Sequence, residues 1–328
     1  MACNLTDKHG RKHSYLRLSL TDKCNFRCFY CMPSENIHFY PKSRLMTADE
    51  IETIARQFVD QGVEKIRLTG GEPLIRKDAD EIIYRLSQLP IELAITTNGY
   101  LLDKYLELFQ RVGLQSINIS LDTLDEEKFH NITQRDYYYK VRSNIQKALK
   151  KGFKIKVNTV VMKGVNDEEI LDFVRWSERE NIHVRFIEFM PFNGNKWDWS
   201  KVVSYKEMLG TIENNIPIEK IEDSTNDTAK NYRVQGGKGT FAVISSITSP
   251  FCGSCNRVRL TADGKLKNCL FSSAETDLLT PLRNGQEILP LIQGNVSSKE
   301  KERGGLNFDK SQDGTELERE RCMAKIGG

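Results

Sequence analysis

The sequence predicts an α/β fold: a partial, TIM-like (β/α)6 barrel that is open at one side, followed by a smaller α+β region. Three observations predict it. Six short runs rich in Ile, Val and Leu recur in the first 190 residues, helical patterns fill the gaps, and polar, glycyl or cysteinyl residues follow the runs. Strands that are joined by helices pair in parallel. Six units are fewer than the eight that close a full barrel, so we expect an open edge.

The expected strands and helices alternate in chain order. The first helix begins at Thr47, which forms a capping box with Glu50, and Gly62 is placed to end it. The expected strands are 15–20, 65–69, 93–97, 116–121, 154–161 and 184–189, and further helices are expected at 78–89, 101–112, 138–151 and 167–179. The segment Thr97-Asn98-Gly99 at the end of the third strand we interpret as turn chemistry alone.

The pattern weakens beyond Met190, where we place a domain boundary between 1–192 and 193–328. Residues 222–239 are polar and rich in glycine, and 240–270 have the pattern of short strands. The strongly charged segment 296–321 is expected to be helical or mobile.

Composition excludes several classes of protein. The 328 residues contain 48 Lys and Arg against 45 Asp and Glu, a net charge of +3, which is too weak to favour a nucleic-acid binder. No apolar run approaches the roughly 18 residues of a transmembrane helix, and no secretory signal is visible, so we expect a cytoplasmic protein without a membrane partner.

The first group of cysteines is Cys24-x3-Cys28-x2-Cys31, directly after the first expected strand. Structural zinc usually takes four ligands, whereas three thiolates leave one iron of a four-iron cluster open to a reactant. Thiolates bind both zinc and iron–sulfur clusters, and the spacing favours the cluster over a partial zinc knuckle.

A second group of three cysteines, Cys252-x2-Cys255-x13-Cys269, lies some 220 residues later. Taken alone it suits a zinc site with a distant fourth ligand, and beside the first group it suits a second four-iron cluster that anchors a substrate. Cys3 and Cys322 lie outside both groups, and we interpret them as plain structural or surface thiols.

Five basic residues occur in apolar strand patterns. Arg17, Arg67 and Lys156 lie inside short apolar runs, where a cation is costly unless it meets an anion. Arg257 and Arg259 share one face of a strand because the side-chain period is two. A phosphate pocket accounts for these residues, and outward-facing or snorkelling side chains are the alternative. No GxxxxGK[ST] loop is present, so a nucleotide would be held as a substrate.

The motifs resemble those of the radical S-adenosylmethionine (SAM) superfamily. The spacing of the first cysteine group, with Tyr30 before its last cysteine, and Gly70-Gly71-Glu72-Pro73 after the second strand carry that resemblance. With the second cysteine group, nearly the whole chain resembles the GTP 3′,8-cyclase family of molybdenum cofactor biosynthesis, and residues 222–239 and 296–321 match it only loosely. The segments that match include RLSLTDKCNFRCFYCMP, IRLTGGEPLIR, INISLDTLD, VRFIEFMP and FCGSCNRVRLTADGKLKNCLF.

This resemblance implies a set of cofactors, sites and partners. Two [4Fe-4S] clusters are implied, one on each cysteine group, with SAM bound to the first and the guanine base of GTP meeting the second. The implied SAM contacts are Tyr30, Gly71, Ser120 and Met190; the implied GTP contacts are Arg17, Arg67, Thr96, Lys156, Arg257 and Arg259; and the terminal Gly327 and Gly328 are implied to enter the active site.

The implied reaction removes the ribose 3′ hydrogen of GTP and joins that carbon to C8 of guanine. The implied partners are a low-potential electron donor, the downstream cyclic pyranopterin monophosphate synthase and a second copy of the chain in a homodimer. Two alternatives stay open: a radical SAM enzyme that modifies peptides and carries an auxiliary cluster, and a zinc-stabilised binding module, which leaves Gly70-Gly71-Glu72-Pro73 unexplained.

Overall fold

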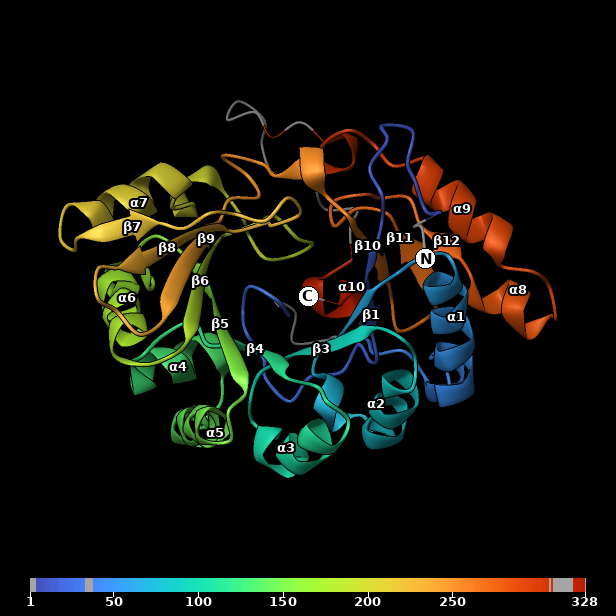
Figure 1. Ribbon diagram of the computed structural model, residues 1–328, viewed down its shortest axis with the longest axis horizontal. Coiled ribbons are helices and arrows are strands. Elements are labelled where there is room, and N and C mark those ends of the chain that lie inside the picture. The colour runs from blue at the N-terminus through green and yellow to red at the C-terminus, as the bar shows by residue number, and fades with distance from the viewer. Residues whose placement is uncertain (1–3, 33–37, 307, 309–320, 328) are drawn as a thin grey trace.

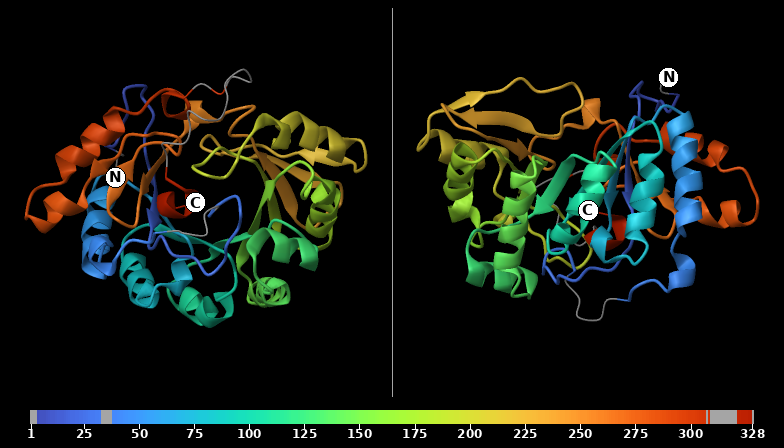
Figure 2. Two further views of the ribbon diagram at one scale, coloured as in Figure 1. Left: turned by 180° about the vertical axis from the view of Figure 1, so that it is seen from behind. Right: turned by 60° about the horizontal axis from the view of Figure 1, so that its bottom comes forward.

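The computed structural model describes residues 4–32, 38–306, 308 and 321–327. Within these residues, twelve strands form one sheet in the order β12-β11-β10-β1-β2-β3-β4-β5-β6-β9-β8-β7. The sheet curves into an open barrel with helices on its outer side (Figures 1 and 2). The predicted α/β architecture is therefore confirmed.

The six predicted strands are present, each within one residue of its expected bounds. They are β1 (Tyr15–Ser19), β2 (Lys65–Thr69), β3 (Glu92–Thr97), β4 (Ser116–Ser120), β5 (Lys154–Val161) and β6 (His183–Glu188). Neighbours among them are parallel.

The helices that connect these strands cover the outer face of the sheet (Figure 1). They are α1 (Ala48–Asp60), α2 (Ala79–Ser87), α3 (Leu102–Arg111), α4 (Glu126–Thr133), α5 (Tyr138–Lys150) and α6 (Ile170–Arg179). The capping box of α1 is confirmed, because Thr47 Oγ1 accepts from the Glu50 amide and Glu50 Oε2 accepts from the Thr47 amide. Helix α4 was not predicted; it is short and capped by Asp125.

The two faces of the sheet differ in chemistry. On β1, Leu16 and Leu18 are fully buried and belong to the apolar core beneath the helices. The alternate positions carry Tyr15, Arg17 and Ser19, because successive strand side chains point to opposite faces. The inner face of the barrel is therefore polar, and it is the face on which a polar ligand can bind.

Both edges of the six-stranded unit are extended by the C-terminal region. Strand β10 (Arg257–Leu260) pairs in parallel with β1, and β9 (Thr240–Ile244) pairs in parallel with β6, so eight consecutive parallel strands occur in the described part of the chain instead of the expected six. This pairing satisfies backbone groups that an open edge would expose. The sheet thus continues across residue 192. The domain boundary that we place there stays a prediction.

The outer strands of the sheet are antiparallel. Strands β11 (Lys265–Lys267) and β12 (Thr276–Asp277) follow β10, and β8 (Lys230–Val234) and β7 (Ile218–Lys220) follow β9. Strand β8 lies in 222–239, where only a polar, glycine-rich pattern was noted.

Three further helices and a buried tail complete the described fold. The helices are α7 (Tyr205–Glu213), α8 (Leu279–Arg283) and α9 (Leu289–Ser297). The tail helix α10 (Met323–Ile326) lies inside the curve of the sheet (Figure 1). Ile326 is buried there against Phe192, Ile247 and Phe271. None of the described helices is long and apolar enough to cross a membrane.

Candidate functional site

The first cysteine group lies in a loop that interlocks with the glycine motif after β2. Gly71 N donates to Thr21 O (2.8 Å) and Glu72 N donates to Lys23 O (2.8 Å). A Cβ added at Gly71 would lie 2.3 Å from Lys23 O, so only glycine fits against this backbone. The sequence motif therefore fixes the path of the chain that enters Cys24.

Glu72 organises the next loop from a fully buried position. Its carboxylate accepts hydrogen bonds from Leu74 N (3.0 Å), Thr97 Oγ1 (2.8 Å) and Asn98 N (2.6 Å). Burial raises the pKa of Glu72 to about 7, although the hydrogen bonds oppose the rise. Asn98 Nδ2 lies 3.8 Å from Cys24 Sγ. The interpretation of 97–99 as turn chemistry alone is therefore wrong, because Asn98 reaches the cysteine site.

The three thiols of this group are electrostatically unfavourable as isolated thiolates. Burial raises the pKa of Cys24 to about 11 and raises the pKa of Cys28 and Cys31 well above the usual value for a thiol. Glu72 raises that of Cys24 further, and Asp122 raises the other two. Because a thiolate is the form that binds metal, the site favours ligation only where a metal supplies the compensating positive charge.

The fold places only some of the four residues assigned to SAM by resemblance near one another. Tyr30 OH donates to Asp122 Oδ2 (2.6 Å), two residues beyond Ser120 at the end of β4, so Tyr30 and Ser120 share one side of the cysteine loop. Gly71 lies at the end of β2. Met190 follows β6 and packs against the apolar cluster that holds the tail, and no described contact joins it to the other three.

A row of arginines crosses the inner face of the barrel. Arg259 on β10, Arg17 on β1 and Arg67 on β2 are partners in register, so they lie side by side on three adjacent strands. Arg67 Nε donates to Tyr15 OH (2.5 Å) and its Nη1 to Ile95 O (3.0 Å), which orients the guanidinium along the sheet. The alternative of outward-facing side chains is thereby wrong for Arg67, which is 3% exposed.

Two cations on β5 and β6 face the row from the other side of the barrel. Burial lowers the pKa of Lys156 to about 8, and next in size is the positive charge of Arg185. Burial lowers the pKa of Arg185 to about 9, with Arg67 the next cause, and that of Arg259 to about 10, with Arg257 next. An anion between these cations would relieve their mutual repulsion.

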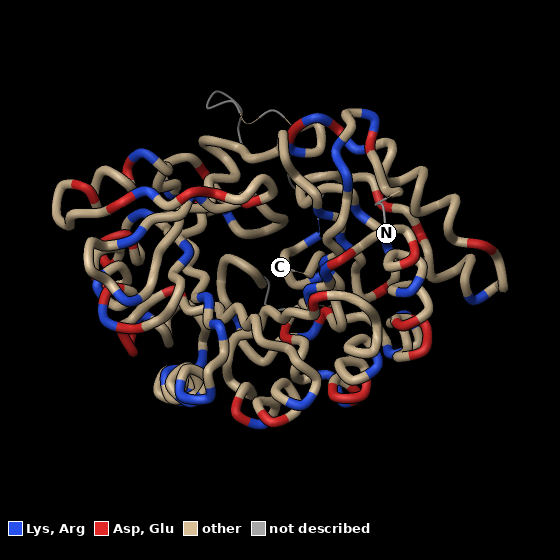
Figure 3. Tube along the Cα trace, in the orientation of Figure 1, with Lys and Arg blue, Asp and Glu red and all other residues tan. Residues whose placement is uncertain are grey.

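Arg185 and Tyr15 are residues of this site that the sequence analysis missed. Arg185 lies within an apolar run, the same signal that singled out Arg17, and it could have been found by that rule. Tyr15 gives no such signal, because a tyrosine is ordinary in a strand. Figure 3 shows how Lys and Arg positions follow the inner strands around the tail.

Several buried polar atoms on the inner strands have no hydrogen-bond partner among the described residues. Such atoms are uncommon in native proteins and need an explanation. They are Thr69 Oγ1, Thr96 Oγ1, Asn118 Oδ1, Asn158 Oδ1, Arg185 Nε, Arg257 Nη2 and Arg259 Nε. They lie on β2 to β6 and β10, around the position that the cations surround, and a polar ligand there would satisfy them.

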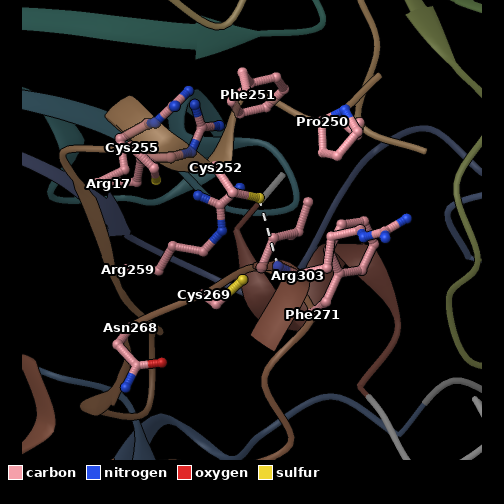
Figure 4. Close-up of a pocket in the computed structure, with 13 residues that line it drawn as sticks. Arg17, Pro250, Phe251, Cys252, Cys255, Arg259, Asn268, Cys269, Phe271 and Arg303 are labelled. Carbon is pink, nitrogen blue, oxygen red and sulfur yellow. Dashed lines mark hydrogen bonds between the residues drawn. The ribbon is translucent and has the colours of Figure 1, made fainter. Parts of the chain in front are cut away.

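The second cysteine group lines a pocket of ≈ 100 Å³ together with Arg17, Arg257 and Arg259. Figure 4 shows Cys252, Cys255 and Cys269 around this pocket with Arg259 among them. The group comes from the short turn before β10 and the loop after β11.

Hydrogen-bond donors contact two of these three sulfurs. Lys299 Nζ donates to Cys255 Sγ (3.4 Å) and the Arg303 amide donates to Cys252 Sγ (3.4 Å). Burial raises the pKa of Cys255, but Lys299 and Arg257 outweigh it and lower that pKa to about 6. The second site therefore carries positive charge where the first carries carboxylates.

The two cysteine groups lie at opposite ends of the barrel strands. Cys255 precedes β10 and Cys24 follows β1, and these strands are parallel with Tyr15 opposite Arg257. The five residues of β1 span about 15 Å. The arginine row lies between the two groups, so a ligand held by the row can reach toward both.

The C-terminal tail closes the first site. The Ala324 amide donates to Cys31, and Gly327 packs so closely on β1 and β2 that an added Cβ would lie 2.7 Å from Thr69 Oγ1 and 2.9 Å from Ser19 Cβ. Cys322 is half-buried and contributes to the raised pKa of Cys31, so it lies near the first group. Its interpretation as a plain structural or surface thiol stays a prediction.

Some predicted features fall outside the described residues. They are Cys3, Gly328 and most of the charged segment after 306. Within 296–306 the chain ends α9 and forms a short 3-10 turn at Arg303–Gly305.

Among the described residues, no three or more His, Cys, Asp or Glu side chains converge closely enough to hold a single metal ion. Three soft thiols and adjacent amide or ammonium donors to sulfur fit an iron–sulfur cluster.

Two family models match consecutive parts of the chain. Residues 18–177 match the radical SAM superfamily and residues 182–304 match Molybdenum Cofactor Synthesis C. The two matches meet near 180.

Known proteins are similar over most of the chain. Molybdenum cofactor biosynthesis protein 1 of Mus musculus is 50% identical over 309 residues, 92% of this chain and 49% of that protein, so the chain spans about half the length of the curated relatives it matches first. The mitochondrial GTP 3′,8-cyclase of Arabidopsis thaliana is 48% identical over 86% of this chain and 74% of that protein. GTP 3′,8-cyclase of Staphylococcus saprophyticus is 44% identical over 87% of each.

A solved structure shows the same fold. Streptococcus suis SuiB bound to S-adenosylmethionine superposes with a TM-score of 0.65 at 18% identity, covering 89% of this chain and 70% of that one. At this identity the likeness concerns the fold.

Proposed function

Because the chain belongs to the GTP 3′,8-cyclase family within the radical SAM superfamily, we propose that it converts GTP to 3′,8-cyclo-7,8-dihydro-GTP, the first step of molybdenum cofactor biosynthesis. The ribose C3′ loses a hydrogen atom and bonds to C8 of guanine. One electron and one proton then complete the product, which is an isomer of GTP.

One observation carries the proposal: the row of cations on the inner face lies between two groups of three cysteines. A triphosphate supplies the anion that these cations need, and a nucleotide is long enough to reach from the row toward both groups. A peptide substrate does not explain why Arg259, Arg17 and Arg67 stand in register.

The residues present fit two iron–sulfur clusters and SAM. Cys24, Cys28 and Cys31 would hold one cluster, and Cys252, Cys255 and Cys269 the other, each leaving one iron for a ligand. When bound, the reduced first cluster supplies the electron that cleaves SAM, and the resulting 5′-deoxyadenosyl radical removes the 3′ hydrogen of the ribose. We assign Tyr30, Gly71, Ser120 and Met190 to the SAM site.

The chain's own residues bind and orient the nucleotide. Arg17, Arg259 and Lys156 donate charge-assisted hydrogen bonds to the phosphates, and Arg185 joins them from β6. Arg67 is held by Tyr15 and Ile95 O, so it presents its remaining N–H donors without losing further side-chain freedom. Binding holds the ribose C3′ beside C8 of guanine in one geometry. This lowers the entropic part of the activation barrier, because the two carbons no longer have to find each other.

Other groups bind the base end and close the site. Arg257 and the second cysteine group line the pocket that would receive guanine. Thr96 on β3 has a buried hydroxyl, and no hydrogen-bond partner for it occurs among the described residues. The tail with Gly327 covers the first cysteine group, where it excludes water from a reactive intermediate.

The test is an anaerobic assay of the reconstituted chain with SAM, dithionite and GTP deuterated at C3′. We expect 5′-deoxyadenosine that carries one deuterium. We also expect a product that has the mass of unlabelled GTP, because it has lost the deuterium, and that separates from GTP by chromatography. ATP, which has the same triphosphate, is the control and should give no cyclised product. Unlabelled 5′-deoxyadenosine with unchanged GTP would show that the radical chemistry is right and the substrate wrong.

Two variants assign the clusters separately. Cys24→Ala should lose formation of both 5′-deoxyadenosine and product, because the first cluster is missing. Cys252→Ala should keep slow SAM cleavage and lose the cyclised product. A colourless chain that binds zinc and cleaves no SAM would instead favour the binding module.

The remaining partners are part of the same proposal. A low-potential electron donor must supply reducing equivalents, and the cyclic pyranopterin monophosphate synthase would consume the product. We also propose a homodimer in the cytoplasm, and sedimentation of the holoprotein at several concentrations tests the dimer.

A further inference from the structure

A buried lysine contacts the second cysteine group from behind. Lys299 lies two residues beyond the end of α9 and is 2% exposed. Its Nζ donates to Cys255 Sγ (3.4 Å) and to Arg257 O (2.8 Å). The ammonium thus joins a sulfur to the first backbone carbonyl of β10, and it fills none of the pocket that would receive the substrate.

Two asparagines hold α9 so that Lys299 meets this sulfur. Asn268, the residue before Cys269, donates to Asn295 O (2.8 Å), and Asn295 donates to Leu266 O (3.2 Å) and to Thr276 Oγ1 (2.9 Å). The C-terminus of α9 is therefore fixed to the loop that carries the third cysteine. A cation at this end of a helix is also favoured by the helix dipole.

The segment after Lys299 is fixed to the same cysteine loop from the other side. Arg11 Nη1 donates to Cys252 O (2.8 Å) and Lys301 O (2.7 Å), and its Nη2 donates to Glu300 O (2.7 Å). Asp7 holds Arg11 by an ion pair of 2.6 Å. Contacts on both sides thus hold Lys299 in one place, so its ammonium can act on Cys255 from a fixed position.

We propose that Lys299 is a positioning residue that raises the reduction potential of the second iron–sulfur cluster through its buried charge and its hydrogen bond to Cys255. This inference rests on the proposed function, because it requires a cluster on Cys252, Cys255 and Cys269. Reduction adds one negative charge to a cluster. A buried cation next to a ligating sulfur stabilises that reduced state more than the oxidised one, because the interior screens charge weakly.

A second buried lysine provides a matched control. Lys267 is 1% exposed, lies two residues before Cys269, and directs its ammonium to Ser272 O and toward Glu275 (3.6 Å). It carries the same charge at a similar depth, but no described hydrogen bond joins it to a sulfur. Removing its charge tests whether any nearby buried lysine shifts the potential.

The experiment is a redox titration of the full chain, followed by electron paramagnetic resonance. Cys24, Cys28 and Cys31 are replaced by serine so that the second cluster alone gives the signal, and the intact holoprotein is measured in parallel. Lys299→Met should lower the midpoint potential, with at least a tenfold fall in the reduced-to-oxidised ratio at fixed potential, about 59 mV for one electron. Lys299→Arg keeps the charge and should hold the midpoint potential close to that of the parent chain. Lys267→Met should change the potential by less than a third of the change seen in Lys299→Met.

The outcomes separate this inference from the proposed function. An unchanged potential in Lys299→Met with a fully assembled cluster overturns the inference and leaves the function standing. A parent chain that assembles no cluster on the second group overturns the function itself. If Lys299→Met does not assemble, Lys299→Gln is measured and the same fall is expected. If both neutral variants lose the cluster while Lys299→Arg keeps it, Lys299 acts on assembly and the inference on potential is wrong.

Discussion

Replacing Gly327 by alanine should release the C-terminal tail from the first cysteine site. Gly327 has φ +82°, a left-handed conformation that costs an L-residue about 1 kcal/mol more than glycine. The added Cβ would also lie 2.7 Å from Thr69 Oγ1 and 2.9 Å from Ser19 Cβ. Relieving such contacts costs about 1–3 kcal/mol. The docked tail should therefore lose about 2–4 kcal/mol, a 30- to 1000-fold shift toward the undocked state.

Hydrogen exchange of the tail measures this shift directly. The amides of Ala324 and Gly327 are bonded to Cys31 and to Met323 O in the docked state. Their protection in the holoprotein should fall by the same factor, and formation of cyclised product should fall with it. Iron content should stay unchanged, because no cysteine of either group is altered.

Gly285→Ala is the matched control for backbone strain. Gly285 has φ +70° and nothing within 4 Å of an added Cβ, so the variant carries the strain without the contact. Its tail should exchange as slowly as that of the parent chain. Two results would refute the argument from close packing. One is a Gly327→Ala tail as protected from exchange as that of the parent chain, and the other is a loss of tail protection in both variants.

Three further changes test other parts of the site. Arg257→Ala should weaken GTP binding about 10- to 100-fold, the worth of a charge-assisted hydrogen bond, while SAM cleavage without substrate persists; equal loss of both activities contradicts a role in substrate binding. Gly71→Ala places a Cβ 2.3 Å from Lys23 O and should remove iron from the first group alone, as iron analysis with electron paramagnetic resonance will show. Burial, and next the charge of Lys299, lower the pKa of His13 from 6.5 to about 4, so its stabilisation is present above pH 6.5 and about 3 kcal/mol is lost as pH falls to 4; urea unfolding of the metal-free chain measures it, and His13→Gln should remove that part of the pH dependence.

The barrel itself was predictable because each of its elements has a local signal. The strands are short apolar runs, and α1 has its capping box and its terminal glycine. The pairing of β10 with β1 had no such signal, since strand partners that are far apart in sequence are chosen by the free edges of the sheet. Helix α4 was missed because its eight residues have few apolar positions.

The candidate site divides in the same way. Spacing alone singled out the cysteines and Gly71 as candidates, and their misfit in apolar strands singled out Arg17 and Arg67. Lys299 could not be found, because a lysine in a charged segment is normally solvated and only the packing of α9 buries it. Asn98 was missed because asparagine is common in turns, and its contact with Cys24 depends on the buried carboxylate of Glu72.

The sheet order also determines when the protein can become complete during synthesis. Strand β10 covers the edge of β1, yet the paired residues lie roughly 240 positions apart in the chain, so the edge of β1 stays exposed until the C-terminal third has left the ribosome. Pairing at such sequence separation is slow, and an exposed edge strand invites association with other nascent chains. The arginine row and the pocket for the second cluster both include β10. The second cysteine group can therefore take up the cluster proposed for it only after this last pairing, whereas the first cysteine loop can meet its partners from β2 and β3 much earlier.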